Sequence, residues 1–159
     1  MKGILLFRID DRLIHGQVVI GWTSVLNSNS ILLCDDSVYE NEWEKELYLS
    51  CAPDYLKITI LNIAQTIDYL KSAETDLSGT IVLVNGPEVI EKLLDSGIEI
   101  PKINVGGMHF RQGRKGYLSY LYINDDEVET FKRCMDRGVY FECQDVPTGN
   151  KVNLKNLLN

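Results

Sequence analysis

The chain has 159 residues, of which 45% are hydrophobic and 25% charged, and it carries a net charge of −7. This size and balance indicate one compact globular domain, residues 1–159, with little room for a second domain. The acidic charge argues against a nucleic-acid partner, and no stretch approaches the ~20 consecutive apolar residues of a membrane span.

Apolar segments of strand length alternate along the chain with amphipathic segments of helix length. This alternation is typical of an α/β fold with an open, mainly parallel sheet and helices on both faces. We predict seven strands, at residues 3–9, 30–35, 56–62, 80–85, 102–106, 119–123 and 139–144. We predict helices at residues 16–27, 38–51, 63–73, 87–96 and 125–137.

The turn after the first predicted strand carries the strongest chemical signal. Residues 8–17 read RIDDRLIHGQ, and helical apolar spacing begins directly afterwards. His15 is therefore expected at a strand-to-helix turn, at the carboxyl end of a parallel strand where α/β proteins bind ligands. The N–H groups of the helix N-terminus, together with Arg8 and Arg12, would stabilise an anion at this turn.

A histidine in this setting can accept a phosphoryl group. Its ring must be neutral, with one nitrogen free and the other holding its proton against an acceptor, which Asp10, Asp11 or a loop carbonyl could supply. Phosphoryl transfer depends mainly on alignment and charge stabilisation, so this set of groups suffices, with no metal and no cofactor. The ordinary alternative for a lone loop histidine is a capping or surface role.

Several other residues have both a functional and a plain structural interpretation. Asp35 and Asp36 follow the second strand, and we expect at least one of them to cap the next helix. His109 follows Gly106 and Gly107 at the end of the fifth predicted strand and could line the same crevice as His15, since parallel strands end at the same edge of a sheet. We interpret it as a hydrogen-bonded support residue rather than as a second catalytic histidine, and the two glycines as permitting close backbone approach or positive φ. Within residues 107–118, which break the βα alternation, a basic cluster could dock an acidic partner, steady a phosphate or form a solvated face. Its members are Arg111, Arg114 and Lys115.

Six further residues are interpreted as packing groups. Trp22 and Trp43 lie at helical apolar spacing, and we predict that both anchor the core. The four cysteines form no C-x-x-C pair and lack the density of a disulfide framework, so we expect reduced packing residues. They are Cys34, Cys51, Cys134 and Cys143.

The apolar run near the N-terminus is too short for a signal peptide, which favours a cytoplasmic protein.

The run from Arg8 to Val18 closely resembles the phosphorylation-site motif of the IIB component of the mannose/fructose/sorbose class of the bacterial sugar phosphotransferase system. The likeness covers essentially the whole chain. It extends to Asp35-Asp36, Asn104–Arg111, Gly138-Val139 and Asp145–Thr148.

The resemblance implies a free-standing IIB protein that acts as a phosphohistidine–sugar phosphotransferase. His15 would accept a phosphoryl group from the IIA component, on Nδ1, and pass it to a sugar delivered by the membrane components IIC and IID. Contacts with IIA and with the membrane complex would be transient, so the protein would be peripheral at the membrane. Arg8 and Arg12 would act with His15, supported by Asp10, Asp11, Gly16, Gln17, Asp35 and His109.

Two alternatives come from other functional classes. A receiver-type signalling domain is phosphorylated on aspartate and could hold Mg²⁺ at Asp10-Asp11. However, the third strand leads into Leu61-Asn62 rather than an acceptor aspartate, and the fifth leads into Gly106-Gly107 rather than a lysine. A non-covalent anion-binding module would use the same arginines and helix N-terminus. A dinucleotide enzyme is disfavoured, since no G-x-G-x-x-G follows the first strand.

Overall fold

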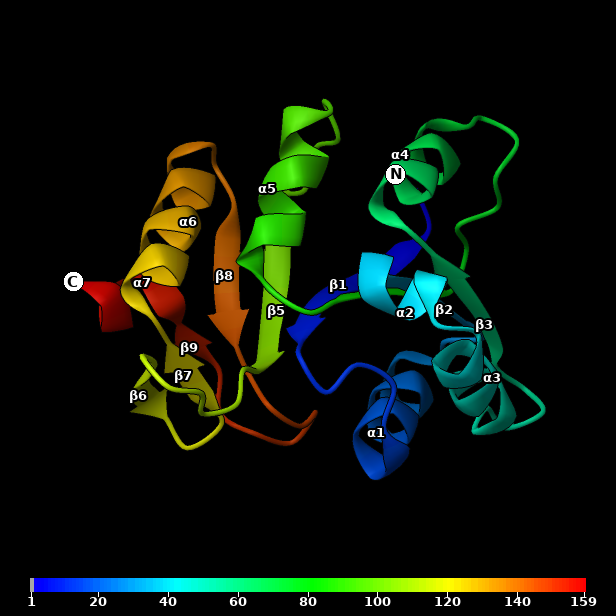
Figure 1. Ribbon diagram of the computed structural model, residues 1–159, viewed down its shortest axis with the longest axis horizontal. Coiled ribbons are helices and arrows are strands. Elements are labelled where there is room, and N and C mark those ends of the chain that lie inside the picture. The colour runs from blue at the N-terminus through cyan, green and yellow to red at the C-terminus, as the bar shows by residue number, and fades with distance from the viewer. Residues whose placement is uncertain (1) are drawn as a thin grey trace.

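A computed structural model describes residues 2–159, apart from the side chains of Gln17 and Val18 (Figure 1). The strands are β1 (Ile4–Asp10), β2 (Ser30–Cys34), β3 (Lys57–Leu61), β4 (Thr80–Val84), β5 (Lys102–Gly107), β6 (Lys115–Leu118), β7 (Leu121–Ile123), β8 (Tyr140–Cys143) and β9 (Val152–Asn153). The helices are α1 (Gly16–Leu26), α2 (Asp36–Glu40), α3 (Glu42–Ser50), α4 (Ile63–Lys71), α5 (Pro87–Asp95), α6 (Asp125–Asp136) and α7 (Leu154–Leu158).

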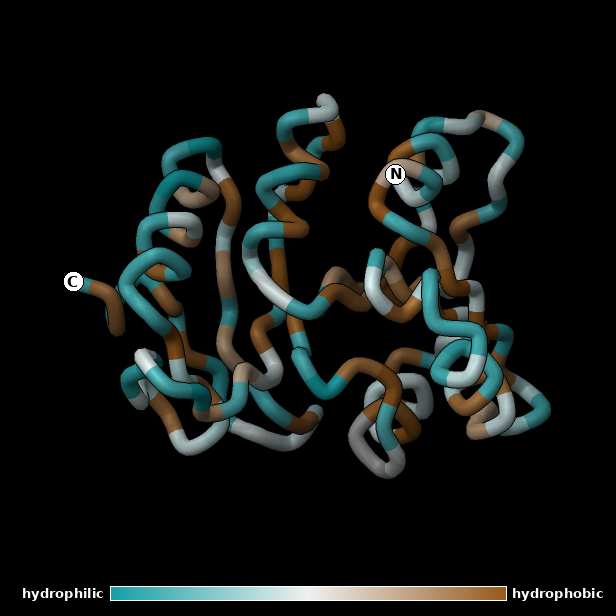
Figure 2. Tube along the Cα trace, viewed as in Figure 1, coloured by the Kyte–Doolittle hydropathy of each residue, from teal (hydrophilic) through white to brown (hydrophobic). Residues whose placement is uncertain are grey.

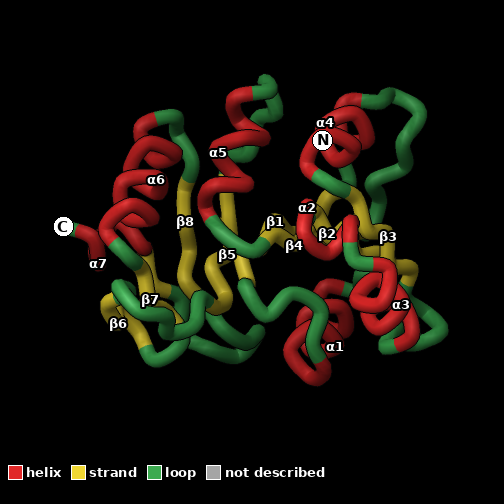
Figure 3. The backbone as a smooth tube through the Cα atoms, in the orientation of Figure 1, coloured by secondary structure: helices red, strands yellow, loops and turns green. Residues whose placement is uncertain are grey.

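The main sheet has seven strands in the order β3-β2-β4-β1-β5-β8-β9. All neighbouring pairs are parallel except β8 and β9, which are antiparallel. Helices connect the parallel strands, as Figure 3 shows by colour. The predicted α/β class with a mainly parallel sheet is therefore confirmed.

The membership of the sheet differs from the prediction in one strand. The strand predicted at 119–123 appears as β7, which pairs antiparallel with β6 in a separate two-stranded sheet. The seventh strand of the main sheet is instead β9, which lies in residues that the sequence pattern left unassigned. Its pairing spans only Val152 and Asn153, too short an apolar run to produce a strand signal.

The helix predicted at 38–51 is divided in two at Asn41. This residue ends α2 and begins α3 with an extended backbone, and its side chain accepts a hydrogen bond from the backbone N–H of Glu44 at 3.0 Å. Asparagine favours such caps because its short side chain satisfies an otherwise free N–H group. The predicted single helix is therefore two short helices, α2 and α3, separated by Asn41.

The hydrophobic core lies on both faces of the sheet. One cluster packs α4, α5, α6 and α7 against the strands, and a smaller one packs α1, α2 and α3 against the other face. Figure 2 shows the hydrophobic stretches concentrated in the strands and the hydrophilic ones on the outer turns of the helices. Within residues 2–159, no helix is long and apolar enough to cross a membrane.

The predicted packing groups divide between core and surface. Trp22 is buried as predicted, but the prediction for Trp43 is wrong, since it is 72% exposed on α3, a helix that buries none of its residues. Three of the cysteines are buried and free as expected, and burial raises the pKa values of Cys34 and Cys134 to about 11 and that of Cys143 to about 12. Cys51 is exposed at the end of α3, so its interpretation as a packing residue is also wrong.

Candidate functional site

The site forms where β1 and β5 end side by side. Asp10 of β1 pairs with Gly107 of β5, and the N–H of Asp11 donates to the Gly107 carbonyl at 3.0 Å. The parallel register therefore brings the loop before α1 next to the segment that contains His109. These are the two segments that sequence analysis placed at the same carboxyl edge.

The loop before α1 is held by a turn and by two buried side chains. The N–H of Leu13 donates to the Asp10 carbonyl at 2.9 Å, and Leu13 has φ of 61°. That left-handed conformation costs about 1–3 kcal/mol for a residue other than glycine. Leu13 and Ile14 are both buried in the core beside α1, and this burial offsets the strain. The loop is thus fixed in the conformation that presents His15.

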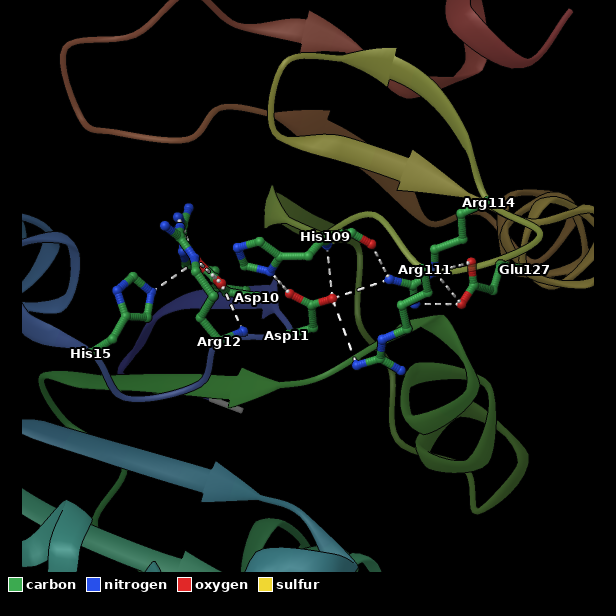
Figure 4. A network of polar contacts seen from close by, with 9 residues as sticks. Asp10, Asp11, Arg12, His15, His109, Arg111, Arg114 and Glu127 are labelled. Carbon is green, nitrogen blue, oxygen red and sulfur yellow. Dashed lines mark hydrogen bonds and ion pairs between the residues drawn. The ribbon is translucent and has the colours of Figure 1, made fainter.

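His15 occupies the N-cap position of α1, yet its side chain makes no capping bond to the helix. Instead its Nε2 lies 3.4 Å from Oδ2 of Asp10 (Figure 4). An ionised carboxylate can only accept a hydrogen bond, so the nitrogen facing Asp10 carries the proton. This tautomer leaves the lone pair on Nδ1. Sequence analysis offered Asp10, Asp11 or a loop carbonyl as the hydrogen-bond acceptor for the His15 ring, and Asp10 is the one that contacts it.

Asp10 is almost completely buried and ion-paired to two arginines. Arg12 donates to it from Nε at 3.0 Å, from Nη2 at 2.9 Å and from its backbone N–H at 3.2 Å. Burial by itself would raise the pKa of Asp10, but the hydrogen bonds from His15 and Arg12 and the charge of Arg8 outweigh it and hold the pKa well below its usual range. Asp10 is therefore a fixed negative charge beside the His15 ring.

The two arginines differ in their surroundings. Arg8 is buried against the ring of Trp22 and donates to the carbonyls of Gln144 at 3.0 Å and Asp145 at 2.7 Å, and to the side chain of Asn104. Burial lowers its pKa to about 10, which leaves it charged at neutral pH. The Arg12 side chain, by contrast, is 33% exposed. Arg8 thus lies beneath the loop with protein acceptors around it, whereas Arg12 is open to a ligand.

Gly106 leaves the space in which the Arg8 guanidinium lies, because a Cβ on this residue would overlap it. The sequence prediction of a close approach at this glycine pair is confirmed. We expect Gly106→Ala to displace Arg8 and to lower the free energy of unfolding by about 1–3 kcal/mol, the usual cost of overpacking. Urea denaturation measures this change. The matched control is Gly21→Ala in α1, where the nearest atom to a new Cβ is 3.9 Å away; an equal loss in both variants would contradict the account.

A second network runs from Asp11 away from His15. The Asp11 carboxylate accepts from the backbone N–H of His109 at 2.8 Å, from its Nδ1 at 2.5 Å and from Nη1 of Arg114 at 3.1 Å. Arg114 in turn donates to both carboxylate oxygens of Glu127. Glu127 also completes the capping box at the start of α6. His109 is thus a hydrogen-bonded residue at the site, as the sequence predicts.

The basic cluster of residues 111–115 is not a single surface. Arg114 is buried between Asp11 and Glu127, so its predicted docking or solvated role is wrong. Arg111 is exposed and lies 3.9 Å from Asp11, and Lys115 is exposed at the start of β6. The sequence pattern does not distinguish these positions, because one partner of Arg114, Asp11, lies 103 residues away in the chain.

The other predicted support residues lie at varying distances from this network. Asp35 caps α2 through the N–H of Val38 at 2.9 Å, as predicted, and its other oxygen accepts from Asn85 at 3.1 Å, so its contacts stay at the ends of β2 and β4. Gly16 is exposed in the first turn of α1. The side chain of Gln17 lies outside the described residues.

Three contributors were missed by sequence reasoning: the side chain of Asn104 and the backbone carbonyls of Gln144 and Asp145, all of which hold Arg8. Backbone acceptors leave no signal in residue type. Within the described part of the chain, no group of three or more His, Cys, Asp or Glu side chains is placed to hold a metal ion.

Comparisons with known proteins point in one direction. A family model described as the PTS system sorbose subfamily IIB component matches residues 4–159. The chain is 34% identical to the N-acetylgalactosamine-specific phosphotransferase enzyme IIB component 1 of Escherichia coli (strain K12), across 93% of this chain and 94% of that protein. It is 32% identical to the PTS system mannose-specific EIIAB component of the same strain, across 97% of this chain but only 48% of that protein. The chain thus spans about half the length of the latter relative.

A solved structure is similar over almost the full length. The crystal structure of the IIBSor domain of the sorbose permease from Klebsiella pneumoniae superposes with a TM-score of 0.92 and 28% sequence identity. The match covers 99% of this chain and 96% of that chain.

Proposed function

The chain belongs to the sorbose subfamily of IIB components of the phosphotransferase system, a family of sugar phosphotransfer proteins, and on that basis we propose that it carries a phosphoryl group on His15. The donor would be the phosphohistidine of a IIA component. The acceptor would be a sugar delivered by the IIC/IID membrane complex, which the protein meets transiently from the cytoplasmic side.

The observation that carries the proposal is the contact between His15 and Asp10. Because the carboxylate fixes the proton on Nε2, the nucleophilic lone pair is on Nδ1 and the incoming phosphorus would bond there. Asp10 also stabilises the positive charge that develops on the ring when the phosphoryl group is bound. The ring needs no rearrangement before it reacts.

Two groups would neutralise the charge of the bound phosphoryl. The first is the N-terminus of α1, which starts directly after His15 with free N–H groups and the positive end of its dipole. The second is Arg12, whose partly exposed side chain is anchored to Asp10. Arg8 would act through Asp10 as a positioning residue.

The receiver alternative is disfavoured by the contacts of the two aspartates. Asp10 is enclosed by Arg8, Arg12 and His15, and Asp11 by His109 and Arg114. Carboxylates in such ion pairs are poor ligands for Mg²⁺, because the cation would have to displace positive partners. A non-covalent anion-binding module would use Arg12 and α1 in the same way, and it differs in forming no bond to His15.

The proposed function is tested by incubating the protein with phosphoenolpyruvate, the general components of the system and a IIA protein of this class. We expect a label that is lost in acid and stable in base, as a phosphohistidine is. Label cleaved by base would indicate an acyl phosphate and a receiver-like reaction. No covalent label with fully phosphorylated IIA would favour the anion-binding module.

Arg12→Ala is expected to slow phosphoryl uptake from phospho-IIA about 10²-fold, because one preorganised charge donor is lost. Single-turnover transfer, followed by quenched flow, measures this rate. Arg12→Lys keeps the charge but loses the paired contact with Asp10, and it should fall between the wild type and the alanine variant. An unchanged rate in Arg12→Ala would remove Arg12 from the transfer step.

A further inference from the structure

Trp22 links helix α1 to the buried arginine of the site. It lies in the second turn of α1 and is 6% exposed. The guanidinium carbon of Arg8 lies 4.9 Å from the centre of the Trp22 ring, a distance at which a cation is attracted to an aromatic face. At the edge of the ring, Nε1 donates to the carbonyl of Asp145 at 3.2 Å. Trp22 thus contacts Arg8 with its face and the segment after β8 with its edge.

The carbonyl of Asp145 is shared by these two side chains. It accepts from Nη2 of Arg8 at 2.7 Å as well as from Trp22. The segment that contains this carbonyl is itself held in place, because the buried side chain of Gln144 donates to two carbonyls of residues 147–149, at 3.1 and 3.0 Å. Trp22 and Arg8 are therefore both held by one well-anchored acceptor.

Helix α1 is attached to the ion pair of Arg8 and Asp10 at two points. At its N-terminus, Nε2 of His15 lies 3.4 Å from Oδ2 of Asp10. Two turns along, Trp22 contacts Arg8, whose Nη2 lies 3.2 Å from the same oxygen of Asp10. A small cavity between α1 and the sheet also has Arg8, Asp10 and Trp22 in its wall. Two attachments fix both the position and the direction of a helix, whereas the His15 contact alone would let α1 pivot.

We propose that Trp22 is a positioning residue for phosphoryl uptake, an inference that rests on the proposed function. In uptake, Nδ1 of His15 forms a bond to phosphorus as the bond between phosphorus and the histidine of IIA breaks, and the electron pair of the broken bond stays on the donor nitrogen. This transfer depends on alignment and charge stabilisation, so a small displacement of the ring or of the α1 N-terminus slows it. By holding Arg8, and through Arg8 the Asp10 carboxylate, Trp22 keeps both in place.

A role in packing alone would give a different result. Trp22 belongs to the smaller hydrophobic cluster beside α1, and so does Leu56, which is also 6% exposed. A residue that only fills this cluster affects the stability of the fold but not the transfer rate of the folded protein. A buried positioning residue lowers the maximal rate of uptake. It leaves unchanged the phospho-IIA concentration that gives half of this rate, because a docking partner does not reach it.

The test compares Trp22→Leu with Trp22→Phe in the full-length protein. Leucine has neither the ring over Arg8 nor the N–H that donates to Asp145, whereas phenylalanine keeps the ring. Uptake is followed by quenched flow over a range of phospho-IIA concentrations. We expect Trp22→Leu to lower the maximal rate by about 10- to 10²-fold at unchanged half-saturation, and Trp22→Phe to recover part of this loss. Because Trp22→Phe has lost the N–H, it should itself be slower than the wild type, so the test does not depend on the folding of Trp22→Leu.

Leu56→Ala is the matched control. It should lower the free energy of unfolding, measured in urea, and leave the maximal rate of uptake unchanged. Wild-type maximal rates in both Trp22 variants, a change in half-saturation alone, or an equal loss of rate in Leu56→Ala would overturn the assignment. If the wild type takes no label on His15, the proposed function itself fails, and this inference fails with it. A labelled wild type with unaffected Trp22 variants removes this inference alone.

Discussion

His15→Ala is expected to abolish phosphoryl uptake from phospho-IIA, because His15 is the N-cap residue of α1 and the charged side chains beside it are poor nucleophiles. Lysine and arginine are protonated at neutral pH, and both aspartates are ion-paired. The measurement is incorporation of label from phosphoenolpyruvate through IIA. The side chain of His15 makes one polar contact among the described residues, so the free energy of unfolding should change by no more than about 1 kcal/mol.

The matched control for this variant is His109→Asn, which removes the other histidine of the chain. It should incorporate label to the same extent as the wild type. Label in His15→Ala, or loss of label in His109→Asn alone, would show that the acceptor had been assigned to the wrong residue.

Asp10→Asn is expected to lower the free energy of unfolding by about 3–5 kcal/mol near neutral pH, because it leaves the buried Arg8 without a counter-ion. It should also slow phosphoryl uptake, since an amide can turn its NH₂ group toward the His15 ring and no longer fixes the proton on Nε2. Urea denaturation gives the stability change. Asp54→Asn, at an exposed position, is the control and should stay within about 0.5 kcal/mol of the wild type.

The same pair of proteins tests the ionisation of Asp10. Its pKa is lower in the folded chain than the ordinary value of 3.8, so its contribution to stability is present above that pH and is lost as the pH falls toward the folded-state pKa. The stability difference between wild type and Asp10→Asn should therefore be constant above about pH 5 and should narrow below about pH 4. A difference that grows on acidification would contradict the pairing of Asp10 with the two arginines.

The parallel sheet and the place of His15 could be predicted because both depend on local patterns. Buried strands rich in Ile, Leu and Val, with helical spacing between them, define the βα alternation, and the carboxyl edge of such a sheet is where its loops bind ligands. The largest difference between the predicted and the observed fold concerns the strands in the C-terminal part of the chain. There β9 pairs through two residues only, and the predicted strand 119–123 found an antiparallel partner in β6 instead.

Within the site, the sequence places Arg8 and Arg12 on one loop but does not distinguish their roles. That difference arises because Arg8 lies in β1 and donates to the carbonyls of Gln144 and Asp145, more than 130 residues away, whereas Arg12 lies in the loop after β1. The burial of Arg114 likewise depends on Asp11, which lies 103 residues before it in the chain, as well as on Glu127 of α6. Local residue spacing does not indicate long-range partners of this kind, and the burial of Arg114 was therefore not predicted.

The central claim is that Nδ1 of His15 carries the phosphoryl group while Asp10 holds the proton on Nε2. The most direct test is heteronuclear NMR of protein labelled with ¹⁵N in its histidine rings, recorded before and after phosphorylation through IIA. The account predicts a ³¹P–¹⁵N coupling at Nδ1 of His15, with the Nε2 proton retained. A coupling at Nε2 of His15, at either nitrogen of His109, or at no ring nitrogen in fully phosphorylated protein would contradict it.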